Sequence, residues 1–452
     1  MENQQQVTLG NAPVGKLLLK LAVPTITAQL VSVLYNMVDR MYIGHIPDVG
    51  ANALTGVGVC LPIIVIAASF AALTAAGGAP RASIFMGKGQ NDTAESILGN
   101  CTLAVTFMGL ALTAIFLLWG YDLLTLFGAS ENTIGYAWDY MYIYAFGTVF
   151  VLISLGLNTF ITAQGFTKIS MLSVIIGGVS NVVLDPIFIF AFGWGVKGAA
   201  LATIISQALS AAWILRFLTG KKTILRIKKS TLKFSAKIYL PCLALGLAPF
   251  VMQSTEWLIT ICFNYSLLKY GGDIAVGAMT ILCSIMQLSM LPLTGLTQGA
   301  QPIISFNFGA GQYDRVKSAF FVLLKASIIY GAVIWALSVF TPNLMVSIFT
   351  SDPMLKEYAA SALRIYMATS LLFGIQVACQ QTFLALGNAK TSLFLAALRK
   401  LILLIPLIFI LPQFIAQQDI AVFTAEPVAD VLAVSATSVL FYRYFKKTIN
   451  KK

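Results

Sequence analysis

The sequence predicts an all-α membrane protein with twelve transmembrane helices, arranged as two pseudo-symmetric six-helix bundles with both termini in the cytoplasm. The composition, the apolar runs and an internal repeat lead to this prediction. Of the 452 residues, 58% are hydrophobic and only 10% are charged, at a mean hydropathy of +0.85. A soluble domain of this size cannot cover so much apolar surface, so we expect lipid to surround most of the chain.

Twelve apolar runs are long enough to cross a bilayer, whose core is roughly 30 Å thick and needs about 20 residues per helix. They lie near residues 17–44, 53–78, 97–119, 136–160, 169–193, 197–218, 238–266, 275–300, 316–340, 358–385, 391–412 and 420–442. The first run continues far past the length of a signal peptide and shows no small-residue cleavage site, so we expect it to remain as a helix.

Charged residues between the runs predict the orientation in the membrane. Every second connection is basic, from Lys16 and Lys20 through the stretch 216–237 to Arg443, and the connections between them are acidic or neutral. By the positive-inside rule, the basic connections and both termini are cytoplasmic. We therefore expect a multi-pass protein of the cell (inner or cytoplasmic) membrane, and we also expect a monomer. Its net charge of +12 favours anionic lipids at the cytoplasmic face and not nucleic acid.

An internal repeat relates the two halves of the chain. GGAPRASIFMGKGQND, which begins at Gly77, matches GAQPIISFNFGAGQYD, which begins at Gly299, and further matches maintain the same offset (299 minus 77). The predicted divisions are an N-terminal lobe of residues 1–218, a basic cytoplasmic linker of residues 219–237 and a C-terminal lobe of residues 238–452. Parallel repeats of this kind place the substrate site between the halves, and we expect the halves to rock about the linker.

Acidic residues inside the apolar runs are the candidate functional residues, because a charged side chain within a span costs about 2.5 to 3.5 kcal/mol on insertion scales. Asp39, Asp185 and Glu256 lie about 28, 26 and 28 Å along their helices from the basic residues that anchor their runs, at a rise of about 1.5 Å per residue. They therefore share one depth in the outer half of the membrane. The repeat aligns Asp39 with Glu256, whereas Asp185 aligns with Ile405.

A carboxylate pair in a partly dry cavity can take up a proton or, with amide and hydroxyl oxygens, hold a sodium ion. Asn181 lies one turn before Asp185 on the same helix face, and Thr203 faces it from the sixth run. Pro24 and Pro186 are positions where a helix can bend. If sodium is the coupling ion, the predicted ligands are Asp39, Asn181, Asp185 and Thr203.

Simpler interpretations of several residues remain open. Asp39 can pair with Arg40 near the outer surface, and Glu426 with Asp430, four residues apart on one face of the last helix, can form an interfacial face. Three alternating tyrosines at the start of the fourth run are expected to form an aromatic interface belt more than a wall for drug stacking; they are Tyr140, Tyr142 and Tyr144.

These residues resemble the multidrug and toxic compound extrusion (MATE) family over nearly the whole chain. VPTITAQLVSVLYNMVDRMYIG resembles the family's opening helix, with its bending proline and outer-half acid, and SNVVLDPIFIF resembles its fifth helix. In the bacterial subgroup related to DinF, an aspartate pair lies in a polar network that couples the ion. Carried over by motif, the network here is Asp39, Tyr140, Asn158, Asn181, Asp185, Ala199 and Thr203.

The resemblance implies antiport, in which inward flow of protons or sodium ions drives export of hydrophobic, often cationic drugs, with no cofactor beyond the coupling ion. Glu256 departs from the DinF-related subgroup, because a glutamate in the seventh helix is more typical of the NorM type. We assign Glu256, Glu426 and Asp430 to a substrate-binding or second ion site. The chain resembles MepA-like drug exporters most.

Two other functions compete with antiport. An enzyme is not favoured, because the sequence has one histidine and no HExxH, Walker A or GxGxxG motif. A lipid-linked precursor flippase of the same superfamily is the nearer alternative, and it usually has an arginine-rich cavity for a pyrophosphate. The basic residues in or near the spans are no more numerous than the acids, which favours cationic cargo; they are Arg40, Lys325, Arg364, Arg399 and Lys400.

Overall fold

The computed structural model describes residues 8–449, and every regular element in that range is a helix. Within this range, ten helices are long and apolar enough to cross a membrane, or up to eleven if one bent pair of helices counts as a single span. The chain is therefore an all-helical, multi-span membrane protein, as its sequence predicts. Because water is absent from the bilayer core, each span has to satisfy its own backbone hydrogen bonds, and a helix does so within one segment.

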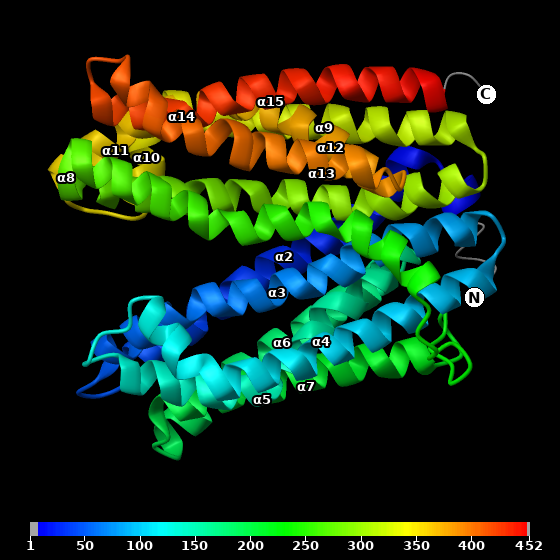
Figure 1. Ribbon diagram of the computed structural model, residues 1–452, viewed down its shortest axis with the longest axis horizontal. Coiled ribbons are helices and arrows are strands. Elements are labelled where there is room, and N and C mark those ends of the chain that lie inside the picture. The colour runs from blue at the N-terminus through cyan, green and yellow to red at the C-terminus, as the bar shows by residue number, and fades with distance from the viewer. Residues whose placement is uncertain (1–7, 450–452) are drawn as a thin grey trace.

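The first group of helices, which we call the N-terminal lobe, lies in the lower half of Figure 1. It consists of α2 (Val14–Gly44), α3 (Gly50–Gly87), α4 (Asn91–Leu126), α5 (Ile134–Ala163), α6 (Thr167–Pro186), the π-helix η1 (Ile187–Ala191) and α7 (Gly195–Thr219). These elements match the first six predicted runs in order.

The second group, which we call the C-terminal lobe, lies above the first in Figure 1. It consists of α8 (Ala236–Gly309), α9 (Tyr313–Phe340), α10 (Pro342–Ser347), α11 (Pro353–Tyr366), α12 (Ser370–Ala385), α13 (Ala389–Ala397), the π-helix η2 (Leu398–Leu404), α14 (Ile405–Ile410), the 3-10 helix η3 (Leu411–Gln413) and α15 (Gln418–Thr448).

Two features of the C-terminal lobe explain why the count of candidate spans differs from twelve. The 74-residue element α8 contains two predicted runs, 238–266 and 275–300, and its helical geometry is interrupted at Gly272, where φ is 65° and ψ is −163°. The predicted run 358–385 is divided between α11 and α12, which meet at a bend of 48°.

The repeat is visible in the backbone at the turns between helices. Gly89 and Gly311, which the repeat offset relates, have φ angles of 74° and 73°. Gly165 and Gly387, related by the same offset, have φ angles of 84° and 76°. Only glycine adopts such angles without strain, so the two halves reverse direction by the same turns.

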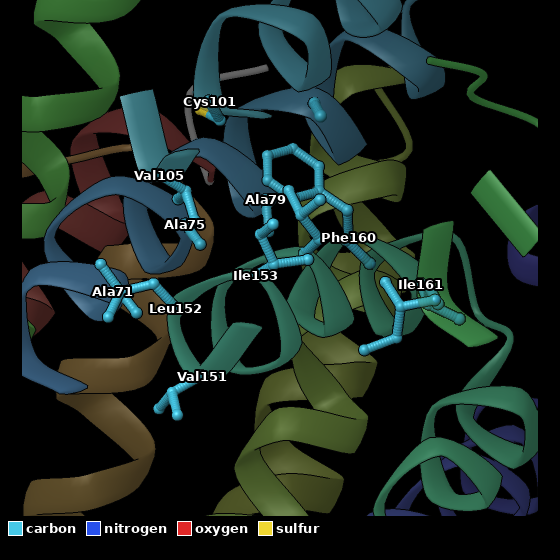
Figure 2. Packing of buried hydrophobic residues seen from close by; sticks show 14 of the residues in the cluster. Ala71, Ala75, Ala79, Cys101, Val105, Val151, Leu152, Ile153, Phe160 and Ile161 are labelled. Carbon is cyan, nitrogen blue, oxygen red and sulfur yellow. The ribbon is translucent and has the colours of Figure 1, made fainter. Parts of the chain in front are cut away.

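Small side chains on α3 allow the N-terminal lobe to pack closely. Ala71, Ala75 and Ala79 recur every four residues, so they share one face of α3. Figure 2 shows this face among Val105 of α4 and Phe160 of α5, and all five side chains are buried in one cluster. Small residues let membrane helices approach closely, which replaces the hydrophobic driving force that lipid removes.

Glycines also line the contact between the two lobes, which we call the seam. Gly77 of α3 lies against the backbone of Cys242 and Gly246 on α8, and its repeat counterpart Gly299 lies against Ala22 of α2. A methyl group on either glycine would overlap the opposite helix. The seam lies toward the end of the molecule that holds both termini, and the two lobes diverge toward the other end (Figure 1).

A second pair of glycines extends the seam at the same end. Gly87 of α3 lies against Phe306 of α8, and Gly309 of α8 lies in turn against Ile84 of α3. Farther along the seam, the Thr25 hydroxyl on α2 donates to the Gly295 carbonyl on α8 at 2.6 Å. The lobes are therefore in backbone contact at the end that holds the termini.

The predicted linker, residues 219–237, is bound to the N-terminal lobe. Gln164 Oε1, at the end of α5, accepts hydrogen bonds of 2.8 to 2.9 Å from the Thr223 hydroxyl and from the backbone N–H groups of Ile224 and Leu225. Glu95 of α4 forms an ion pair with Lys228. These contacts are buried on the lobe side, so the linker is not a free hinge.

Candidate functional site

The carboxyl groups of Asp39 and Asp185 meet within the N-terminal lobe. Asp39 lies in the last turns of α2, and Asp185 lies at the end of α6, next to the π-helix η1. Their side chains are within hydrogen-bonding contact of each other. Asp185 is fully buried, and its Oδ1 accepts a hydrogen bond of 3.2 Å from the Asn181 amide one turn earlier.

One oxygen of each carboxyl group lacks a donor. Asp39 Oδ1 and Asp185 Oδ2 are buried and have no hydrogen-bond partner among residues 8–449. An ionised carboxylate only accepts hydrogen bonds, so two carboxyl groups can bond to each other only when one of them carries a proton. The arrangement is therefore chemically suited to a shared proton or to a cation that both groups ligate.

Tyr140 and Thr203 flank the carboxyl pair. Tyr140 of α5 is 4% exposed and lies near both Asp39 and the Thr203 hydroxyl of α7. Ala199 lies one turn before Thr203 and is fully buried. The structure thus gathers residues from α2, α5, α6 and α7 around two carboxyl groups.

The tyrosines Tyr140, Tyr142 and Tyr144 of α5 do not form a single surface. Tyr140 and Tyr144 are buried and stacked, with ring centroids 6.0 Å apart, whereas Tyr142 is 46% exposed. Only Tyr142 is placed to take part in an interfacial belt.

Asn158, the remaining residue of the predicted network, does not join this cluster. It lies about 27 Å from Tyr140 along α5, given the helical rise per residue. Its amide donates to the Ser170 carbonyl at 3.3 Å, and Ser170 lies in the first turn of α6, whereas Asp185 lies in the last. The residue types matched the network by motif, but the helix rise places Asn158 toward the opposite end of the lobe.

The two predicted bending prolines lie in different surroundings. Pro186 is the last residue of α6, and the π-helix η1 begins directly after it, so the helix is irregular at this point. Pro24 is buried inside α2, which is a single uninterrupted helix in this structure. Pro24 precedes Thr25, whose hydroxyl bonds across the seam.

The three candidate acids of the C-terminal lobe, Glu256, Glu426 and Asp430, are each bound to a basic residue. Arg399 on η2 donates from Nη2 to Glu426 at 2.9 Å and from Nε to Asp430 at 2.7 Å. Both carboxyl groups are 2% exposed, so Glu426 and Asp430 are interior residues of α15 and not an interfacial face. The Thr369 hydroxyl, between α11 and α12, donates to the second oxygen of Asp430 at 3.4 Å.

Glu256 forms an ion pair with a different basic residue, Lys400. Lys400 on η2 donates to Glu256 Oε1 at 2.8 Å, and the lysine side chain is only 6% exposed whereas the glutamate is 58% exposed. Glu256 is the repeat counterpart of Asp39, and Lys400 lies five residues before Ile405, the counterpart of Asp185. The C-terminal lobe therefore has an ion pair where the N-terminal lobe has two carboxyl groups.

Comparison with known proteins identifies the family. The sequence model of the MatE family matches the chain twice, over residues 24–187 and 248–410. The chain belongs to the MatE family. The starting positions of the two matches, 24 and 248, are related by nearly the same offset as the repeat, so each half of this MATE transporter carries one copy of the family's unit.

Curated relatives of this MATE chain include multidrug exporters. The multidrug export protein MepA of Staphylococcus aureus (strain N315) is 25% identical over 415 residues, which are 91% of this chain and 90% of that protein. MepA of Staphylococcus haemolyticus (strain JCSC1435) is 24% identical over 436 residues, which are 96% of this chain and 95% of that protein.

Solved MATE structures share the fold. The MATE multidrug transporter DinF-BH is 34% identical with a TM-score of 0.86, and the match covers 96% of each chain. The outward-facing conformation of a multidrug resistance MATE transporter of the MOP superfamily has a TM-score of 0.91 at 21% identity, over 98% of each chain. The second likeness concerns the fold alone.

The sequence pattern alone does not assign Arg399 and Lys400 to the site of this MATE chain. Both are basic residues in or near a span, and the repeat pairs neither of them with an acid. The signal is present in AALRKLILL. Each of two adjacent cations in a membrane span costs as much insertion free energy as an acid does, so each needs an oppositely charged partner. The π-helix that orients them, which is often found at functional sites, has no comparable sequence signal.

Proposed function

We propose that this chain is a secondary active multidrug efflux antiporter of the cell membrane, which exports hydrophobic or cationic compounds in exchange for protons or sodium ions by alternating access. The contact between Asp39 and Asp185, buried and short of donors, is the observation that carries the proposal. Membership of the MatE family and the multidrug export relatives support it. The exchange for an inward-moving ion rests on the chemistry of the carboxyl pair.

The proposed topology has twelve spans with both termini in the cytoplasm. The interruption of α8 at Gly272 and the bend between α11 and α12 support this count, because α8 then supplies two spans and the bent pair supplies one. The basic linker and the basic C-terminal end of α15 support a cytoplasmic assignment for the end that holds the termini. The proposed lobes are residues 1–218 and 238–452, joined by residues 219–237.

Ion loading would act at the carboxyl pair. A proton shared by Asp39 and Asp185, or a sodium ion held with Asn181 and Thr203, removes the repulsion between the two carboxylates and favours their approach. About 21 Å of continuous helix, given the rise per residue, joins Asp39 to Thr25 at the seam. A bend at Pro24 would therefore change the contact between the lobes.

The proposed rocking takes place at the seam and not within the linker. The linker is bound to the N-terminal lobe through Gln164 and Glu95. The segment before α2 is bound to the C-terminal lobe, because Arg315 donates to the carbonyls of Leu9 and Ala12 at 3.2 and 2.8 Å. The linker thus moves with the N-terminal lobe, and the segment before α2 moves with the C-terminal lobe.

The C-terminal lobe is proposed as the substrate-binding or second ion site. Glu256 is the exposed acid of the three, and a cationic drug would compete with Lys400 for it. This arrangement does not favour the flippase alternative. A pyrophosphate needs free basic side chains, but Arg399 and Lys400 are engaged by Glu426, Asp430 and Glu256.

Substitution of the carboxyl pair tests the proposal. Asp39→Asn and Asp185→Asn are each expected to abolish drug resistance in a hypersensitive host while the protein still inserts in the membrane. Asp139→Asn is the matched control, because this acid of the same lobe is 43% exposed and pairs with Lys197 at 3.4 Å. Resistance retained by both pair variants would overturn the ion-coupling role.

Proteoliposomes identify the coupling ion and the role of Glu256. Efflux of a fluorescent organic cation is measured under an imposed pH gradient and, separately, under a sodium gradient. A gradient that drives efflux in the wild type and not in Asp39→Asn identifies the ion. If Glu256 binds cargo, Glu256→Gln weakens the apparent affinity for the drug and leaves the choice of ion unchanged; if it binds a second ion, the dependence on the gradient changes.

A further inference from the structure

The bend between α11 and α12 breaks the symmetry of the two lobes. Residues 367–369 separate the two helices, which meet at 48°. The repeat offset relates this segment to residues 145–147, which lie inside the uninterrupted helix α5. The break is therefore a feature of the C-terminal lobe alone.

A groove opens beside the break. It has a volume of about 570 Å³ and lies between the end of α11, the bend and the first half of α15. Most of its lining is apolar, from Ile365, Ala368, Pro427, Val428, Val431 and Leu432. Val431 and Leu432 are 43% and 48% exposed, so the groove faces the surroundings of the protein and not its interior.

The position along α15 places the groove at the level of the hydrocarbon. Thr424 and Leu432 bound the groove on α15, which begins at Gln418 at its outer end. At a rise of about 1.5 Å per residue, the groove extends from about 9 to about 21 Å along the helix from Gln418. On the proposed topology, an acyl chain of the outer leaflet passes this surface.

Arg364 supplies the single charge of the groove lining. Its Nε donates to the Val339 carbonyl at 3.2 Å, next to the end of α9, and the residue is exposed. No carboxylate within residues 8–449 forms an ion pair with it. Its terminal N–H groups are thus placed near the membrane surface for a phosphate, which guanidinium binds through paired hydrogen bonds.

We propose that this groove binds one acyl chain of an outer-leaflet phospholipid whose phosphate is held by Arg364. An apolar channel with one guanidinium at its outer end matches an apolar chain with one phosphate. The inference rests on the proposed topology, because the headgroup and the tail have to enter from the outer leaflet.

The bound chain would support the ion pairs of the C-terminal lobe. Thr369 lines the groove and donates to Asp430, which Arg399 binds on its other oxygen. Pro427, also in the lining, follows Glu426. A chain packed against both residues restrains the bend and the face of α15 that carries the two acids.

Native mass spectrometry of the purified full-length chain tests the proposal, with phosphatidylglycerol and a diacylglycerol of the same chains as probes. The wild type is expected to retain phosphatidylglycerol in several-fold preference to diacylglycerol. Arg364→Gln is expected to lose the preference, and Ala368→Trp, which fills the groove, is expected to lose retention of both probes. Thermal unfolding of each variant checks that it is folded. If Ala368→Trp does not fold, Arg364→Gln alone still tests the proposal.

Matched controls locate the effect. Leu110→Trp adds the same bulk at an exposed position on α4, and Arg443→Gln removes a basic residue at the other end of the molecule; both are expected to behave as the wild type. Unchanged retention in Arg364→Gln and Ala368→Trp would overturn the proposal, as would equal losses in the controls. Binding of rhodamine 6G in place of the phospholipid, lost in Ala368→Trp, would overturn it in favour of a drug site. The assay uses no ion gradient, so its failure leaves the antiport proposal untouched.

Discussion

Lys400 donates at 2.8 Å to Glu256, the repeat counterpart of Asp39, and lies five residues before Ile405, the counterpart of Asp185. The same two repeat elements, the first and fifth helices of each half, meet in both lobes. In the N-terminal lobe they bring together two acids, which need an external cation. In the C-terminal lobe one partner is a lysine, so the cation is built into the chain.

Lys400→Gln is predicted to strengthen the binding of cationic drugs. The substitution removes the cation that competes for Glu256, and a partly exposed ion pair contributes up to about 1 kcal/mol, or roughly fivefold in affinity. Fluorescence anisotropy of rhodamine 6G with purified protein measures the change. Lys197→Gln, which removes the cation of the exposed pair with Asp139, is the control. Equal affinities in Lys400→Gln and the wild type would show that Glu256 does not bind the drug.

Arg399→Gln is predicted to destabilise the C-terminal lobe. Arg399 is the ion-pair partner of both Glu426 and Asp430, and these acids are 2% exposed. Removal of one partner from a buried ion pair costs about 3 to 5 kcal/mol, because the remaining charge stays buried without compensation. Thermal unfolding in detergent measures the loss. The triple variant with Glu426→Gln and Asp430→Asn is expected to recover most of it; no recovery would mean that Arg399 stabilises the lobe mainly through its packing against Phe373.

The fold was largely predictable because its signals are local. A single apolar run that crosses the bilayer has no water to bond with, so it forms a helix, which satisfies its backbone hydrogen bonds within one segment. The repeat was detectable because the turns that join the helices require glycine, and Gly89 and Gly311 have nearly the same φ angle. The interruption of α8 at Gly272 falls between the predicted runs 238–266 and 275–300, where the sequence predicts a connection.

The candidate site was only partly predictable from residue spacing. Asp39, Asp185 and Asn181 came together as expected, because the rise per residue fixes their depth from the basic anchors. Asn158 was assigned by motif, and the same rise places it about 27 Å from Tyr140 along α5. The partners of Glu426 and Asp430 could not be predicted, because the π-helix η2 sets the direction in which Arg399 points.

Gln164→Ala is predicted to release the linker from the N-terminal lobe. Gln164 Oε1 accepts three hydrogen bonds from residues 223–225, and the side chain is fully buried. Its removal leaves buried backbone donors without an acceptor, at a cost of about 1 to 3 kcal/mol for each unsatisfied group. Limited trypsin digestion is expected to cleave after Lys221 and Lys222 faster than in the wild type. Ser96→Ala, which removes an exposed hydroxyl on α4, should leave the rate unchanged. An unchanged rate in Gln164→Ala would mean that other contacts hold the linker.

Gly309→Ala is predicted to shift the protein toward the conformation in which the seam is open. Its added methyl group would overlap the Ile84 carbonyl on α3, and a backbone group cannot move aside as a flexible side chain can. Overpacking of this kind costs about 1 to 3 kcal/mol in the closed arrangement and nothing once the helices separate, so the open state gains roughly fivefold or more in population.

Gly58→Ala is the matched control, because this glycine is also in a helix but has open space around it. Pulsed electron resonance between spin labels at Lys88 and Lys317, in a background without native cysteines, measures the separation of the lobes. A longer distance in Gly309→Ala and not in Gly58→Ala would identify the seam as the gate at the end that holds the termini, whereas identical distributions would place the gate elsewhere.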